Sequence, residues 1–269
     1  MTRTQRHVEA FRQGDACIQV RDASGRCRAG ILVSVEQESH AFRFGCVVPD
    51  LKTLSDSERQ RYQERLDEVF NCLVPADQPS SPEPSALRVD VAERVHLGLL
   101  RLRLDQCAAS GLPLQVYVWG ETVGMTAADS TDFGEREVGR RVAELYTLCF
   151  AHPSVGGMFW NGFADGEPGV RGGGLLRRDL APKYVHKVLR KLIGFVWHTR
   201  AAGVTDSEGR FRFRGFFGDY RVMADLGEPA ARVDTIAFHR GSADAILFGE
   251  PAASAAGVTV DRLVEMSRE

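Results

Sequence analysis

Two acidic residues, Glu121 and Asp165, are the chain's candidates for catalytic carboxylates. Glu121 follows the β-rich run 112–119, and Asp165 follows the apolar run 155–161. Parallel strands end at one edge of their sheet, so the two side chains could face one another there and exchange protons with a substrate or attack it. Two simpler interpretations stay open: Glu121 is a solvated loop residue, and Asp165 caps its loop or pairs with Arg171.

The segments around these carboxylates alternate between strand and helix patterns. Ser55 and Glu58 form a capping-box signature at the start of the first helical segment. Helices are predicted at 55–70, 91–109, 134–150 and 183–199. Strands are predicted at 42–46, 70–74, 112–119 and 155–160, each followed by a helix. This alternation favours an α/β fold with a parallel sheet of about four β/α units.

The two ends of the chain carry a different pattern, in which apolar and polar residues alternate. It runs through 17–46 and returns in 210–248, interrupted by turns. A period of two predicts half-buried antiparallel strands. We therefore expect a small antiparallel β-sandwich built from the two ends, 1–41 and 201–269, with the β/α region 42–200 inserted between them.

The segment 152–199 has the sequence HPSVGGMFWNGFADGEPGVRGGGLLRRDLAPKYVHKVLRKLIGFVWHT, in which an apolar run is followed by a Gly-rich loop and a helical pattern. It resembles the last barrel segment of glycoside hydrolase family 10, the endo-β-1,4-xylanase family. The family pattern there is HPaVeGi.wWGf.D, then GLl..d..PKPaY.aL..LI. Matching positions hold His152, Pro153, Val155, Gly157, Trp160, Gly162, Asp165, Gly174, Leu175, Leu176, Asp179, Pro182, Lys183, Leu189, Leu192 and Ile193. Two positions depart from the pattern: Asn161 replaces the second Trp, and PKPaY is shortened to PKY at 182–184.

The resemblance implies a barrel of the TIM type from which strands are missing. FRFG at 42–45 matches the family's first strand, FN at 70–71 its second, and GLPLQV at 111–116 its seventh. Strands three to six are absent, and the Pro/Ser-rich segment 75–86 is expected to be a loop in their place. A full barrel takes about 250 residues. Four units would therefore form a partial barrel, open or closed by a second copy in a homodimer.

The family's chemistry implies two glutamates, about 5 to 5.5 Å apart in a retaining enzyme. The acid/base glutamate follows an Asn on the missing fourth strand, and this chain has no Asn-Glu dipeptide. The nucleophile belongs to a Thr-Glu pair on the seventh strand, where Tyr117 and Val118 stand. A bulge or slip could bring Glu121 near that position. The resemblance implies hydrolysis of O-glycosyl bonds in a β-1,4-linked polysaccharide such as xylan; the alternative is an inactive relative that binds carbohydrate.

Three residues beside these strand ends are candidates for binding the sugar. Trp119 and Trp160 could stack on pyranose rings, whose faces present C–H groups, and Asn161 could hydrogen-bond a hydroxyl. The alternatives are that both indoles fill the core with a satisfied N–H group and that Asn161 only ends its strand.

Composition restricts the remaining function classes. A net charge of −2 gives no cationic footprint, so neither nucleic acid nor membrane is an expected partner. The six cysteines and seven histidines are scattered without metal-binding spacing, and we expect no metal and no cofactor. The N-terminal residues have no signal-peptide apolar region, which predicts a cytoplasmic protein as written, although members of the resembled family are often secreted.

Overall fold

The computed structural model describes residues 3–22, 24–77, 87–91, 96–120, 132–170, 172–226, 232–242 and 245–249. The chain divides into two compact units. Met1–Arg12 and Phe42–His198 form an α/β unit, and Gln13–Ala41 and Thr199–Glu269 form a β unit. The N-terminal segment expected to supply sandwich strands therefore also contributes to the α/β unit, through helix α1 (Arg3–Arg12).

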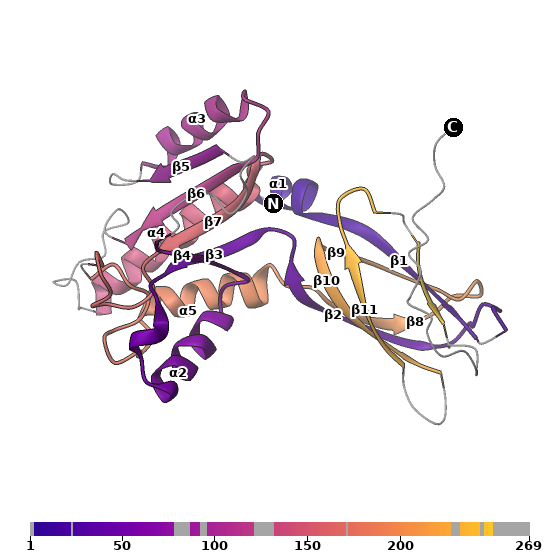
Figure 1. The fold of residues 1–269 in the computed structure, drawn as a ribbon. Coiled ribbons are helices and arrows are strands. Elements are labelled where there is room, and N and C mark those ends of the chain that lie inside the picture. Colours follow the sequence, from indigo (N-terminus) through magenta and orange to yellow (C-terminus); the bar gives the residue numbers. More distant parts are fainter. Residues whose placement is uncertain are drawn as a thin grey trace. The chain divides into compact units, whose positions relative to one another are not determined.

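The α/β unit contains a parallel sheet of five strands in the order β4-β3-β7-β6-β5 (Figure 1). The strands are β3 (Arg43–Val48), β4 (Cys72–Pro75), β5 (Leu87–Val91), β6 (Leu114–Trp119) and β7 (Val155–Asn161). The predicted α/β class with a parallel sheet is confirmed. The strand β5 was not predicted, because its period-two sequence LRVDV ends where the helical pattern of the next segment was taken to begin.

The described helices of the α/β unit are α1, α2 (Asp56–Asp67), α3 (Leu97–Ala108), α4 (Asp132–Ala151) and α5 (Tyr184–Lys191). Ser55 caps α2 with the predicted capping box: its hydroxyl accepts from the Glu58 N–H and the Glu58 carboxylate accepts in return. The last predicted helix is shorter than expected, since α5 continues only as a π-helical turn, Leu192–Val196. None of the helices in the described ranges has the length and apolarity needed to cross a membrane.

The two faces of the parallel sheet bury different aromatic clusters. On one face, which we call the helix face, Phe44 of β3 packs against Phe150 of α4 and Trp197, with ring centroids 5.4 and 5.7 Å away. On the other, which we call the aromatic face, Tyr117 of β6 and Phe159 of β7 stack with centroids 4.9 Å apart. Side chains alternate along a strand, so the parity of a residue decides which face it joins.

The β unit is a two-layered sandwich. One sheet has the order β12-β1-β9 and the other the order β11-β10-β2-β8. Its strands are β1 (Gln13–Arg21), β2 (Leu32–His40), β8 (Arg200–Val204), β9 (Arg210–Phe216), β10 (Gly218–Asp225), β11 (Arg232–Phe238) and β12 (Ala245–Gly249). Ile18, Val35, Phe213, Tyr220 and Val222 belong to its buried core. The sandwich joins both ends of the chain as expected, but β1 and β12 pair in parallel, so it is not wholly antiparallel.

Candidate functional site

The loop between β7 and α5, residues 162–183, lies at the carboxyl ends of the parallel strands. It approaches the end of β6 at backbone level: a Cβ atom on Gly120 would lie 2.1 Å from the carbonyl oxygen of Gly173. Only glycine fits there without a shift of the backbone. The loop, which we call the β7 loop, therefore meets the end of β6 beside Trp119, the region in which the candidate carboxylates were expected.

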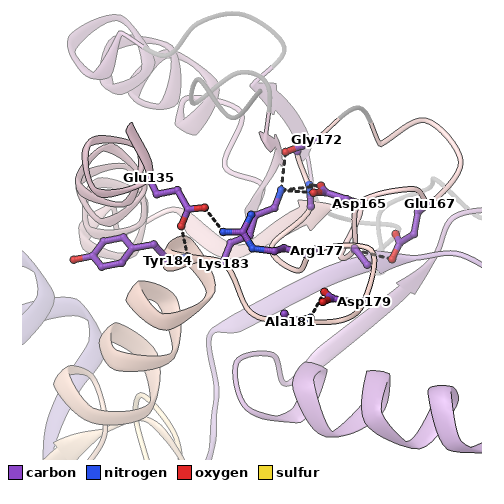
Figure 2. Close-up of polar contacts among 12 residues, drawn as sticks. Glu135, Asp165, Glu167, Gly172, Arg177, Asp179, Ala181, Lys183 and Tyr184 are labelled. Carbon is purple, nitrogen blue, oxygen red and sulfur yellow. Dashed lines mark hydrogen bonds and ion pairs between the residues drawn. The ribbon is translucent and has the colours of Figure 1, made fainter. Parts of the chain in front are cut away.

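Asp165 in the β7 loop forms an ion pair with Lys183, the residue just before α5 (Figure 2). The Lys183 Nζ lies 2.7 and 2.8 Å from the two carboxylate oxygens of Asp165 and also donates to the carbonyl of Gly172 at 2.9 Å. The Gly174 N–H donates to Asp165 Oδ1 at 3.1 Å. These contacts agree with the simpler interpretation that Asp165 stabilises its own loop, and the cationic partner seen is Lys183. Arg171, the partner considered from the sequence, lies outside the described residues.

Glu167, two residues further on, is a half-buried carboxylate that the sequence analysis did not single out. The Tyr62 hydroxyl and the Ala164 N–H donate to its Oε1, both at 2.7 Å, and the Phe163 N–H donates to its Oε2 at 2.9 Å. Burial raises the pKa of Glu167, while these three hydrogen bonds oppose the rise. Its position after Gly166 in a loop offers no sequence signal of burial, because Tyr62 comes from the distant helix α2.

The raised pKa of Glu167 predicts a pH-dependent stability. Because the folded state binds the proton more tightly than the unfolded state, this contribution is fully present below the ordinary pKa of 4.5 and is lost as pH rises through the folded pKa. A Glu167→Gln variant cannot titrate there. We therefore expect wild type to lose stability relative to this variant as the pH rises from 4 towards 7 (~3 pH units). Denaturant unfolding of both proteins across the range checks this, and a constant difference would contradict it.

A third contact fastens the far end of the β7 loop to helix α4. Glu135, in the first turn of α4, accepts from Arg177 at 2.5 Å and from the backbone N–H of Tyr184 at 3.3 Å (Figure 2). Leu180, in the β7 loop between Arg177 and Lys183, has a φ of +64°, in the left-handed region that residues other than glycine rarely adopt. Contacts to α2, to α4 and within the loop therefore fasten the described part of the β7 loop to the helices around it.

The structure corrects the assignment of Trp160 as a stacking platform. Its side chain is fully buried, at 0% exposure, so no ring face is open to a ligand. In the sheet register Trp160 pairs with Cys46 of β3 and Val118 of β6. Its side chain and that of its neighbour Phe159 leave the strand on different faces, so Trp160 lies on the helix face. Its indole N–H donates to the Gly173 carbonyl at 3.2 Å. Trp160 therefore fits the alternative interpretation, in which the indole fills the core and its N–H group is hydrogen-bonded. Through this hydrogen bond it helps to position the β7 loop.

Trp119 and Asn161 are the two candidates that the structure brings together. They lie directly opposite one another in the register of β6 and β7, so their side chains leave the sheet on the same face. Both are half-buried. Trp119 packs against the cluster around Tyr117 and Phe159, and the Arg88 guanidinium lies 6.0 Å from the Trp119 ring. These two residues place an indole and an amide side by side at the carboxyl edge of the sheet.

The expected nucleophile position holds a core residue. Val118 is 0% exposed, and its side chain lies on the helix face of the sheet. Its neighbours Tyr117 and Trp119 lie on the aromatic face, because side chains alternate along the strand. A carboxylate at position 118 would therefore be directed into the helix layer. Glu121 lies outside the described residues, so its assignment as a catalytic candidate stays a prediction.

Candidate metal ligands do not gather in the described part of the chain. No group of three or more His, Cys, Asp or Glu side chains there could hold a metal ion. Cys46 and Cys149, both buried free thiols, have pKa values raised by burial, the latter to about 12. They are protonated at neutral pH and serve as apolar core residues.

Comparisons with known proteins give partial matches. No family model matches the chain. A stretch of 151 residues, 56% of the chain, is 29% identical to part of the anti-sigma-I factor RsgI6 of Acetivibrio thermocellus. That match covers 19% of the relative, so the chain spans about a fifth of the curated protein that it matches.

Solved structures of family 10 xylanases are similar over part of the chain. Xylanase 10B of Thermotoga petrophila RKU-1, solved with xylobiose, matches 40% of this chain and 34% of its own, with 17% identity and a TM-score of 0.30. Xylanase 10B of Thermotoga maritima matches 54% and 45%, with 13% identity and a TM-score of 0.30. The major pilin RrgB of Streptococcus pneumoniae matches 90% and 31%, with 12% identity and a TM-score of 0.22.

Proposed function

We propose that this chain is a shortened relative of the glycoside hydrolase family 10 proteins that binds a β-1,4-linked glycan such as xylan without hydrolysing it. The observation that supports this is the pairing of Trp119 with Asn161 at the carboxyl edge of the parallel sheet. An aromatic ring can stack on the C–H face of a pyranose, and a neighbouring amide can donate to and accept from its hydroxyl groups.

The chemistry of the described carboxylates favours binding over hydrolysis. Both oxygens of Asp165 accept from the Lys183 ammonium group, and Oδ1 also accepts from the Gly174 N–H, so the carboxylate's charge is already neutralised and it is a weaker nucleophile than a free carboxylate. Val118 at the expected nucleophile position can neither attack nor carry charge. The curated relative, of which the match covers 19%, is named as an anti-sigma-I factor.

Replacing Trp119 with leucine tests the binding proposal. Leucine keeps apolar contact with the cluster beneath but removes the flat ring, so we expect the affinity for xylohexaose to fall about tenfold or more, which corresponds to ~1.4 kcal/mol. Asn161→Ala should weaken binding less. Calorimetric titration measures both, with circular dichroism to check that each variant is folded.

Phe195→Ala is the matched control, because Phe195 is an exposed aromatic residue, at 63%, elsewhere in the α/β unit. It should leave the affinity unchanged. The proposal fails if wild type binds none of a panel of β-1,4-linked oligosaccharides. It also fails if Trp119→Leu binds xylohexaose as tightly as the Phe195→Ala control does.

Hydrolysis is a second candidate function, supported by the position of Glu121. It lies two residues after Trp119, which the structure places at the carboxyl edge of the sheet. In this case purified wild type releases reducing sugar from xylan and Glu121→Gln does not. No release by wild type rejects hydrolysis of xylan; equal release by both proteins rejects the assignment of Glu121.

A further inference from the structure

A pocket lined by both charged and apolar residues lies at the opposite edge of the parallel sheet from the β7 loop. It is bounded by α1, by α3 and by the end of α4, where His152 and Pro153 precede the first residue of β7. Its volume is about 260 Å³. We call it the amino-edge pocket. Pockets for drug-sized ligands begin at about 300 Å³, so this one has room for a smaller molecule.

Cationic side chains from two helices line the amino-edge pocket. Arg3 and His7 come from successive turns of α1, and Arg101 comes from α3. In the described part of the chain, neither the Arg3 guanidinium nor the His7 imidazole has a hydrogen-bond or ion-pair partner; His7 has an edge contact with the Phe11 ring, at 5.6 Å. Their N–H groups are therefore free to donate to a ligand.

The single carboxylate in this pocket is already engaged. His152 accepts the Ser154 N–H at Nδ1, so its Nε2 is the nitrogen that donates to Asp105, at 3.1 Å. Asp105 also lies 3.9 Å from the Nε of Arg101. Two guanidinium groups against one carboxylate leave the pocket with one excess positive charge before His7 is counted.

The wall beside these donors is apolar. Phe11, Leu148, Ala151 and Pro153 line the same cavity. A ligand that fills it must therefore combine an anionic group, to accept from the arginines and His7, with a small hydrophobic part. Guanidinium groups suit phosphate in particular, because their planar fork matches its oxygen geometry.

We propose that the amino-edge pocket binds a small phosphate monoester, with the phosphate held by Arg3, His7 and Arg101 and the organic group against Phe11 and Leu148. The site is separate from the glycan site proposed at the carboxyl edge, and either can fail without the other. Free inorganic phosphate shares the anionic group but lacks the part that the apolar wall recognises.

Titration calorimetry at constant ionic strength tests the proposal with the full chain, free of any N-terminal tag because Arg3 lines the pocket. The probes are phenyl phosphate, inorganic phosphate and phenol. Phenyl phosphate should bind saturably and more tightly than inorganic phosphate, and phenol should not bind. No saturable binding overturns the proposal, and equal binding of the two phosphates overturns the assignment to a monoester.

Two substitutions on α3 should act in opposite directions. Arg101→Gln removes a guanidinium from the pocket and should weaken phenyl phosphate binding about tenfold or more. Asp105→Asn removes the opposing charge while keeping an acceptor for His152, and should tighten it. Arg103→Gln, on the same helix but outside the pocket lining, is the control for net charge. If Arg101→Gln and Arg103→Gln weaken binding equally, the interaction is non-specific and the proposal is wrong.

Discussion

Replacing Arg12 with methionine is expected to lower the free energy of unfolding of the α/β unit by about 3 to 5 kcal/mol. Arg12, the last residue of α1, donates to the carbonyls of Phe150, His152 and Val155, each at 2.6 Å. Its guanidinium also lies 4.7 Å from the centre of the Phe42 ring. Methionine keeps the packing but leaves carbonyls at the end of α4 without this donor.

Tryptophan fluorescence during denaturant unfolding measures this effect in the correct unit. All three tryptophans, Trp119, Trp160 and Trp197, belong to the α/β unit, so the signal does not mix in the unfolding of the β unit. Arg12→Lys should give an intermediate loss, because one ammonium group cannot reach all three carbonyls as a fork does. Arg6→Met, on the exposed side of α1, should change stability by less than about 0.5 kcal/mol. Equal effects of Arg12→Met and Arg6→Met would contradict this role of Arg12.

The ion pair between Lys183 and Asp165 should give the second large effect. The Lys183 side chain is 10% exposed and that of Asp165 is 20% exposed, so each is poorly solvated without the other. Lys183→Met leaves the carboxylate with only the Gly174 N–H, and we expect a loss of about 2 to 4 kcal/mol. Lys187→Met, on the exposed side of α5, should be nearly neutral.

A double-mutant cycle separates the pair from its surroundings. Lys183→Met leaves the Asp165 carboxylate without its cationic partner, and Asp165→Asn removes that negative charge. The double variant should therefore lose at least about 1 kcal/mol less stability than the sum of the losses in the two single variants. Additive losses would show that the two side chains act independently. The cycle also bears on catalysis: a loss of activity in Asp165→Asn identifies Asp165 as catalytic only if the protein's stability is unchanged.

Local patterns predicted much of the α/β unit. Each strand from β6 onward in that unit was found where an apolar run met turn residues, and the Ser55 capping box began α2 as expected. One boundary was wrong for a physical reason. The helix predicted at 183–199 keeps its α-helical form only to Lys191 and then widens into a π-helical turn, Leu192–Val196. The strand β8, which was not predicted, starts directly after this segment at Arg200.

The side-chain environment of the candidate residues was harder to predict. The alternation of side chains along β7 puts Trp160 on one face of the sheet and Phe159 and Asn161 on the other. Because both faces of β7 are apolar, the sequence pattern alone does not tell which face the helices cover. Lys183 was not predicted as a partner of Asp165, for a different reason. Arg171 is close in sequence, whereas Lys183, 18 residues away, reaches it because the loop folds back at Gly172 and Gly174.

The chain passes between its two units three times, after Arg12, after Ala41 and after His198. Each unit is therefore made of two separate stretches of chain, and an N-terminal deletion that extends beyond Arg12 removes parts of both. The β unit alone would have to be produced as a fusion of 13–41 to 199–249 through a new linker, and the α/β unit as a fusion across the gap left by 13–41. A protease that nicks one exposed loop should likewise leave the two fragments associated, so mapping the binding sites by simple truncation would mislead.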